Sequence, residues 1–178
     1  MIKTVMAGAV AMTLISFGAS AANQGTGTIN FKGSVIDAPC GIAPESADQT
    51  VDFGQISKAH LNKDGISKKQ FVDIKLVNCE FGTATDATPL KNNLSVAFTG
   101  VAVSTDGTGL GLSDTNAVVK MSGPDGKPVK FDGTASTNIT KLQNGDNTLR
   151  YQAWVQKGAA AVTEGEFSAV ANFALAYN

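Results

Sequence analysis

The sequence predicts an all-β protein that folds as an immunoglobulin-like β-sandwich. Short runs of residues alternate between apolar and polar side chains, the period of a strand with one face in a core. Stretches rich in Gly, Thr, Ser, Asn and Asp separate these runs and are typical of turns. Convincing helical periodicity is absent after residue 21. Because about seven such runs follow one another without a repeat or linker, we expect one antiparallel sandwich domain.

Residues 1–21 have the features of a secretory signal peptide. Lys3 is the single charge among them, an apolar run follows, and Ala19-Ser20-Ala21 fits a signal-peptidase site. The apolar run is too short to span a bilayer. We therefore expect an exported protein that begins at Ala22.

The expected strands follow from the alternation, taken in chain order. They cover residues 26–35, 70–78, 93–99, 117–121, 128–131, 148–156 and a C-terminal strand within 165–178. Residues 55–69 and 82–92 are polar connections, with a short helix expected near 57–61. Residues 123–127 form a turn by composition. The side chains expected to face the core are Val72, Ile74, Leu76, Leu94, Val96, Phe98, Leu149, Tyr151, Ala153 and Val155.

The C-terminal strand poses a question about pairing. Its larger side chains share one parity, from Phe167 through Phe173 and Leu175 to Tyr177, so one face should lie on a core. The strand continues to the last residue, Asn178, and no later segment can cover its free edge. A strand in this position needs a partner to pair with that edge.

Two cysteines, Cys40 and Cys79, lie in the exported part of the chain. An even pair in an exported protein predicts a disulfide rather than a catalytic thiol, since no neighbouring histidine supports the second role. Closing the loop would stabilise the fold by about 4 kcal/mol. Cys79 does not share the parity of Leu76, so we expect it at a strand end or a bulge.

Catalysis and cofactor binding find little support. His60 is the only histidine and lies in a polar stretch, which predicts a solvated side chain without a catalytic partner. One histidine and a cysteine pair do not form a zinc site. The glycines of residues 107–111 lack the Lys-Ser/Thr of a phosphate-binding loop. A net charge of −1 without a basic run argues against a nucleic-acid partner. We expect a non-enzymatic protein without a cofactor.

Two features allow more than one interpretation. Trp154 has the parity of the polar residues of its strand, so it is a solitary surface aromatic, a contact between subunits, or a platform for sugar stacking in a small secreted lectin. The first exported residues place Gly25, Gly27, Ile29 and Phe31 at alternate positions. They form either the first strand of their own domain or an apolar-faced tail that pairs with another domain.

Several motifs together resemble the chaperone–usher pilins, in particular their rod subunits. The C-terminal signature is the most specific: Gly165 fourteenth from the end, alternating apolar residues, and the penultimate Tyr177. The likeness covers essentially the whole chain. The other motifs that carry it are the signal peptide, Asp37-Ala38-Pro39-Cys40, Val51-Asp52-Phe53-Gly54-Gln55, Val77-Asn78-Cys79 and Ala97-Phe98-Thr99-Gly100.

This resemblance implies a fold and a mode of assembly. Such pilins are immunoglobulin-like domains that lack their final strand, so residues 34–178 would form a domain with an open groove beside its last strand. A periplasmic chaperone would fill the groove and anchor the terminal carboxylate of Asn178. At the outer-membrane usher, residues 22–33 of the next subunit would replace the chaperone strand and form a homopolymer on the cell surface that supports adhesion. Ile29 and Phe31 would be the main anchors, and Gly25 would mark where exchange begins.

Overall fold

The computed structural model describes residues 27–83, 90–135 and 139–178. The signal peptide and Gly25 lie outside these ranges. The chain divides into two units, the first ending at Val35 and the second covering Ile36–Asn178. In the first unit, residues 27–35 form neither helix nor strand. The side chains of Ile29, Phe31 and Val35 are 78%, 90% and 103% exposed. The strand expected over 26–35 is therefore not formed in the described residues, because they pair with no other strand.

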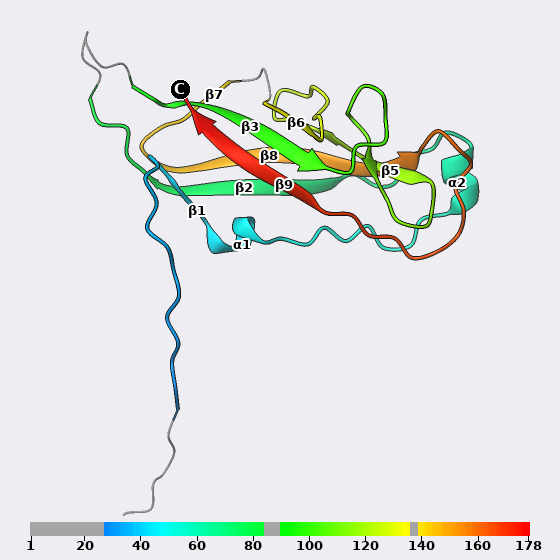
Figure 1. Cartoon of the computed structure of the whole chain (residues 1–178), viewed down its shortest axis with the longest axis horizontal. Helices are drawn as coiled ribbons and strands as arrows, with labels where there is room; N and C mark the ends of the chain where they lie inside the picture. The colour runs from blue at the N-terminus through cyan, green and yellow to red at the C-terminus, as the bar shows by residue number, and fades with distance from the viewer. Residues whose placement is uncertain (1–26, 84–89, 136–138) are drawn as a thin grey trace, which may run out of the picture. The chain divides into compact units, whose positions relative to one another are not determined.

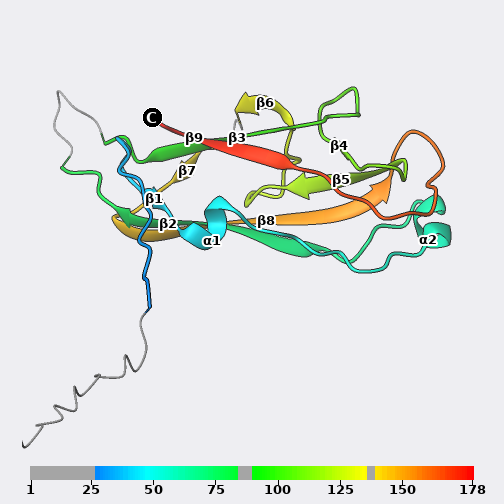
Figure 2. The same cartoon turned by 60° about the horizontal axis from the view of Figure 1, so that its bottom comes forward.

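The second unit is a sandwich of two antiparallel sheets, and the predicted all-β class is confirmed (Figures 1 and 2). One sheet has five strands in the order β1-β2-β8-β5-β4. In the other, β3 pairs with β9 along one edge and with β6 and β7 along the opposite edge. The strands are β1 Gly41–Ile42, β2 Gln70–Cys79, β3 Asn93–Gly100, β4 Leu110–Gly111, β5 Ala117–Ser122, β6 Asp132–Ala135, β7 Thr140–Lys141, β8 Gly145–Lys157 and β9 Ala171–Tyr177.

The core lies between the sheets, where the alternating apolar side chains of β2, β3, β5 and β8 meet. The expected inward residues of β3 and β8 are all buried, as are Ile74 and Leu76 of β2, while Val72 is half-buried. Phe98 is the aromatic centre of this core. Its ring centroid lies 5.1 Å from that of Tyr151, 6.5 Å from Phe131 and 6.3 Å from Phe173.

The strand expected over 128–131 was wrong, and the C-terminal strand is confirmed but occupies only part of its expected range. Residues 128–131 form a single bridge, between Ser122 and Pro128, and the next strand, β6, begins at Asp132. The C-terminal strand begins at Ala171, although the alternation begins at Phe167. The reason is the length of its partner: Ala171 pairs with Gly100, which is the last residue of β3. Alternation predicts an extended chain, but a ladder also needs a neighbouring strand.

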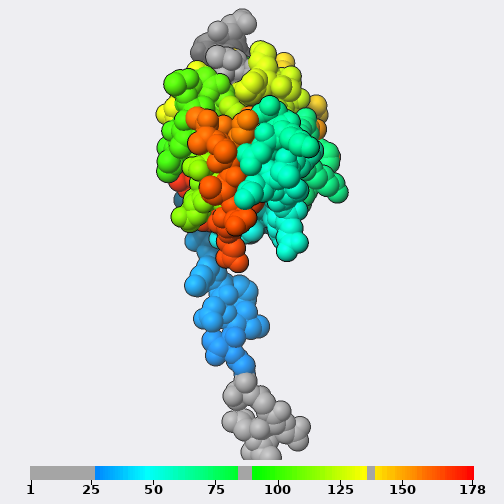
Figure 3. Space-filling view, turned by 90° about the vertical axis from the view of Figure 1, so that its right-hand side faces the viewer, coloured from blue at the N-terminus to red at the C-terminus, as the bar shows by residue number. Residues whose placement is uncertain are grey.

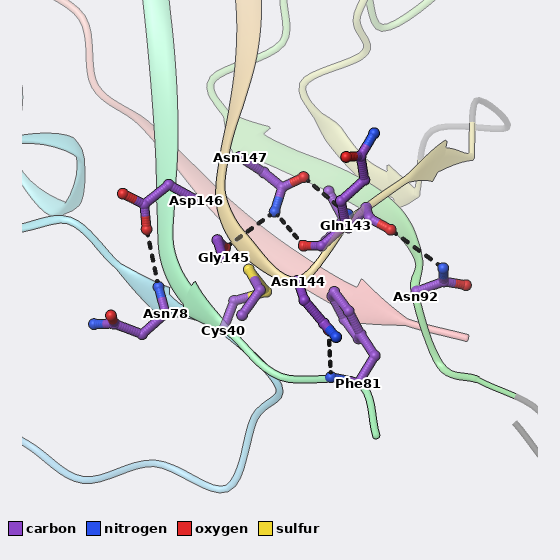
Figure 4. Close-up of a disulfide and its surroundings, with 11 residues drawn as sticks. Cys40, Asn78, Phe81, Asn92, Gln143, Asn144, Gly145, Asp146 and Asn147 are labelled. Atoms are coloured by element: carbon purple, nitrogen blue, oxygen red, sulfur yellow. Dashed lines mark hydrogen bonds between the residues drawn. A yellow bond between two sulfur atoms is a disulfide. The ribbon is translucent and has the colours of Figure 1, made fainter. Parts of the chain in front are cut away.

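The predicted disulfide between Cys40 and Cys79 is confirmed (Figure 4). Both cysteines are buried, and the ladder between β2 and β8 changes register between Leu76 and Cys79. Asn78, with φ of 53°, forms the irregularity and donates its backbone N–H to Asp146 Oδ1 (3.2 Å). This bulge shifts the parity, so Cys79 faces the core at the end of the strand.

Two short helices flank the sheets, α1 Pro44–Ala47 and α2 Lys58–Asn62. The second confirms the helix expected near 57–61, and the Ser57 hydroxyl accepts the His60 N–H at its start. His60 is exposed, with Nε2 3.1 Å from the Ile66 carbonyl oxygen. Asn62 bonds both backbone groups of Val162, which holds the segment after β8 between α2 and the loop before β5 (Figure 3). Within the described ranges, no helix is long and apolar enough to cross a membrane.

Candidate functional site

The sandwich is open along β9. A groove with a volume of about 710 Å³ runs between β9, with the residues that precede it, and the extended segment 46–53 that begins in α1. Core side chains of both sheets form its floor, among them Ile74, Phe98 and Met121. A cleft of this size over an apolar floor exposes surface that a complete sandwich would cover with a strand.

The apolar side chains around the groove are only half-buried, although they pack against the core. The C-terminal segment contributes Phe167 and, in β9, Phe173, and Leu175 and Tyr177 continue the same inward parity toward the end of the strand. The facing segment contributes Val51 and Phe53. Covering such side chains stabilises a fold by about 25 cal/mol per Å² of apolar surface removed from water. The groove is therefore a site with free energy to gain from an apolar occupant.

The backbone of β9 is also open on the groove side. Asn178 and Asn93 exchange both backbone hydrogen bonds, at 2.8 and 3.1 Å. In an antiparallel ladder the bonded pairs alternate, so Ala176, Ala174 and Asn172 also direct their backbone groups toward β3. The N–H and C=O groups of the intervening residues point to the other edge, where the described residues contain no pairing strand. These residues are Ala171, Phe173, Leu175 and Tyr177.

Tyr177 and Gly165, which lie beyond the two ends of the groove-lining residues 167–173, have distinct local features. The Tyr177 hydroxyl is buried and has no hydrogen-bond partner within the described ranges, and burial raises the pKa of this side chain. An unpaired buried hydroxyl costs stability, so this end of the site is not fully satisfied. Gly165 has φ of +153°, a conformation that L side chains rarely adopt, at the turn that leads toward Phe167.

The sequence-predicted residues divide into those at the groove and those away from it. Phe167 and Phe173 line the groove, Leu175, Tyr177 and Asn178 follow farther along the C-terminal segment beyond the lining residues, and Gly165 precedes them all. Gly27, Ile29 and Phe31 belong to the first unit, and Cys40 and Cys79 lie in the core rather than in the groove lining. Segment 46–53, which forms the opposite wall, was not predicted from the sequence. Its only signal was the motif around Val51 and Phe53, which is too short to predict a strand.

Trp154 lies on the outer face of the five-stranded sheet, away from the groove. Its Nε1 donates to Gln156 Oε1 (3.0 Å), and Lys69 Nζ stands 4.8 Å from the ring centroid. A ring with an ammonium over it is not free on that face to stack on a sugar, which disfavours the lectin interpretation. The described part of the chain also holds no cluster of His, Cys, Asp and Glu that could bind a metal.

The fold and the groove together define a class: a β-sandwich in whose described residues no strand covers the last edge. Comparison with known proteins agrees. A family model described as "Fimbrial protein" matches residues 29–178. The F7-2 fimbrial protein of Escherichia coli is 47% identical, over 99% of this chain and 100% of that protein. This chain therefore belongs to the fimbrial protein family.

Two solved structures support the fold. A chaperone–usher pilus, studied for the molecular basis of rod uncoiling, superposes with a TM-score of 0.81 at 43% identity, covering 87% of this chain and 97% of that one. The P pilus rod subunit PapA gives 0.71 at 42% identity, covering 79% of this chain and 100% of that one. The resemblance to chaperone–usher pilins, and to the major rod subunit of P pili in particular, is confirmed.

Proposed function

We propose that this protein is a structural subunit of a surface pilus and that it polymerises by donor-strand exchange, in support of cell adhesion. The N-terminal segment of one copy would pair with the open edge of β9 in another. The observation that carries this proposal is the coincidence, at Phe173, Leu175 and Tyr177, of free backbone groups and half-buried apolar side chains. A strand added there would form main-chain hydrogen bonds and fill the groove with alternate side chains.

The proposed donor is the N-terminal segment that the sequence places at residues 22–33. Ile29 and Phe31 are exposed large apolar side chains on one parity, and Val35 continues the same stripe past Gly33. Fully burying each large side chain contributes about 1.5–3 kcal/mol. Asn30 and Lys32 have the opposite parity, so they would face solvent in the completed sandwich.

The same edge gives the proposed partners their roles. An exposed apolar groove beside an unpaired strand is an aggregation hazard. A periplasmic chaperone that lends a strand would protect it during export and would hold the terminal carboxylate of Asn178. At the outer-membrane usher, the donor segment of the next subunit would replace the chaperone strand. Because both strands need the same free edge, only one can occupy it at a time.

The proposal is tested by changing alternate residues of the donor segment. Deleting residues 22–31, or introducing Ile29→Asp with Phe31→Asp, should leave a subunit that binds the chaperone but forms no fibre. The matched control is Asn30→Ala with Lys32→Ala, which changes the opposite parity and should polymerise normally. Polymer is read as an SDS-stable ladder that collapses to monomer on heating. A normal ladder from the deletion variant would refute donor-strand exchange.

A further inference from the structure

The acceptor edge continues past the beginning of β9, and one residue of another loop holds the continuation in place. The N–H of Ser113 donates to the Ser168 carbonyl oxygen (3.1 Å), and the Ser168 N–H donates to Ser113 Oγ (3.0 Å). We infer that Ser113 positions residues 167–170 as an extension of the strand-accepting edge. This inference rests on the proposed function.

The parity of these two hydrogen bonds supports the inference. Both backbone groups of Ser168 are directed toward Ser113, and Ser168 shares the parity of Asn172 and Ala174, whose backbone groups are directed toward β3. Ser113 thus supplies at Ser168 the donor and the acceptor that β3 no longer provides beyond Gly100. In an extended chain, the backbone groups of Phe167 and Ala169 then point to the same free side as those of Phe173.

Further contacts hold the chain before and after residues 167–170. The N–H of Thr163 donates to the Thr115 carbonyl oxygen (3.0 Å), and the Thr163 hydroxyl donates to the backbone carbonyl oxygen of Asp114 (2.9 Å). At the other end, a Cβ at Gly100 would stand 3.1 Å from the Val170 carbonyl oxygen and 2.4 Å from Leu110 Cδ1. A glycine at position 100 therefore allows the segment to lie close against the end of β3.

The extension changes how long a strand the edge can accept. The β9 ladder alone provides four inward positions, and the Ser113-held segment adds Phe167 and Ala169. The proposed donor stripe, counted from Gly25 and including Val35 just past residues 22–33, has the same number of alternate positions, six in each case. They are Gly25, Gly27, Ile29, Phe31, Gly33 and Val35. An occupant that stopped at Ala171 would leave one end of the donor stripe outside the groove.

The test uses synthetic peptides that copy residues 25–35, 25–31 and 29–35. Their affinities are measured by fluorescence anisotropy for the full exported chain carrying Phe31→Asp, which weakens its own segment as a competitor. Adding Ser113→Ala removes the Oγ acceptor. This substitution should lower the affinity for the 25–35 peptide, and for whichever shorter peptide reaches residues 167–170, by about fivefold, the effect of one hydrogen bond. The affinity for the other shorter peptide should stay unchanged. Ser113→Thr keeps a hydroxyl and should restore binding.

The control is Ser104→Ala, which removes a bond of the same kind, from the Gly109 N–H to Ser104 Oγ (2.7 Å), at a residue that does not line the groove. It should leave all three affinities unchanged. Unchanged affinities in Ser113→Ala, or an equal loss for all three peptides, would overturn the role of Ser113 alone. Failure of the parent chain to bind any peptide would instead overturn the proposed function, and the inference with it.

Discussion

Phe173 offers a direct measure of how much the groove gains when it is filled. Its side chain lies on the inward parity of β9, 6.3 Å from the ring centroid of Phe98, and it lines the groove. In the open subunit this ring is only half-buried, because none of the described residues covers it on the groove side. An occupying strand would complete its burial. The substitution Phe173→Ala should therefore cost more in the filled state than in the open one.

The magnitude follows from the two burial states. Truncating a fully buried Phe to Ala costs about 3–5 kcal/mol, and a half-buried ring should lose about half of that. The difference, about 2 kcal/mol, should appear as a loss of roughly 30-fold in affinity for a peptide copying residues 25–35. Urea unfolding of the variant, with and without peptide, measures both costs.

Asn172→Ala is the matched control, because this exposed neighbour has the opposite parity. The substitution should leave the free energy of unfolding nearly unchanged, both with and without peptide. The m-value should stay constant, so that midpoints report stability alone. If Phe173→Ala costs the same free energy with and without peptide, the ring is not covered by the occupant. The assignment of the groove as the strand-binding site would then fail.

Two further predictions concern the stability of the sandwich itself. Replacing both Cys40 and Cys79 by Ser should lower the free energy of unfolding by about 4 kcal/mol, since the bond closes a loop with a separation of 39 residues; an unchanged denaturant midpoint would contradict this. Arg150, which bonds both carboxylate oxygens of Asp73 at 2.8 and 2.7 Å, holds the pKa of Asp73 below its usual value. This contribution is fully present above the unfolded pKa of about 3.9 and is lost as pH falls through the lower folded pKa. Asp73→Asn should therefore lose stability at neutral pH and show a flatter acid limb in pH-dependent unfolding, whereas an unchanged pH profile would count against the pair.

Local patterns predicted the core strands well because burial and alternation are linked residue by residue. In β3 and β8 every inward position expected from parity is buried. Prediction failed where an element depends on a partner elsewhere in the chain. Residues 128–131 alternate like a strand but form a single bridge, and the short strand β6 follows in a segment with no apolar stripe.

The candidate site likewise has one part that local sequence indicated and other parts that depend on the fold. The motif from Gly165 to Tyr177 indicated one edge of the groove, because its period, its penultimate tyrosine and its terminal position are properties of the chain itself. The opposite wall, residues 46–53, carries too short an alternation to be predicted. The contact between Ser113 and Ser168 joins residues 55 apart in the sequence, and no local pattern signals it.

The sequence by itself thus determined the sandwich class, the paired cysteines and a C-terminal strand with its large apolar side chains on one face. These depend on period, composition and order, which can be read along one chain. Only the tertiary structure decided where the ladder ends, which wall faces β9, and how Ser113 continues the edge beyond Gly100. Those features depend on which backbone groups find partners across the fold, and hydrogen-bond pairing between distant segments exists only after the sheets have packed.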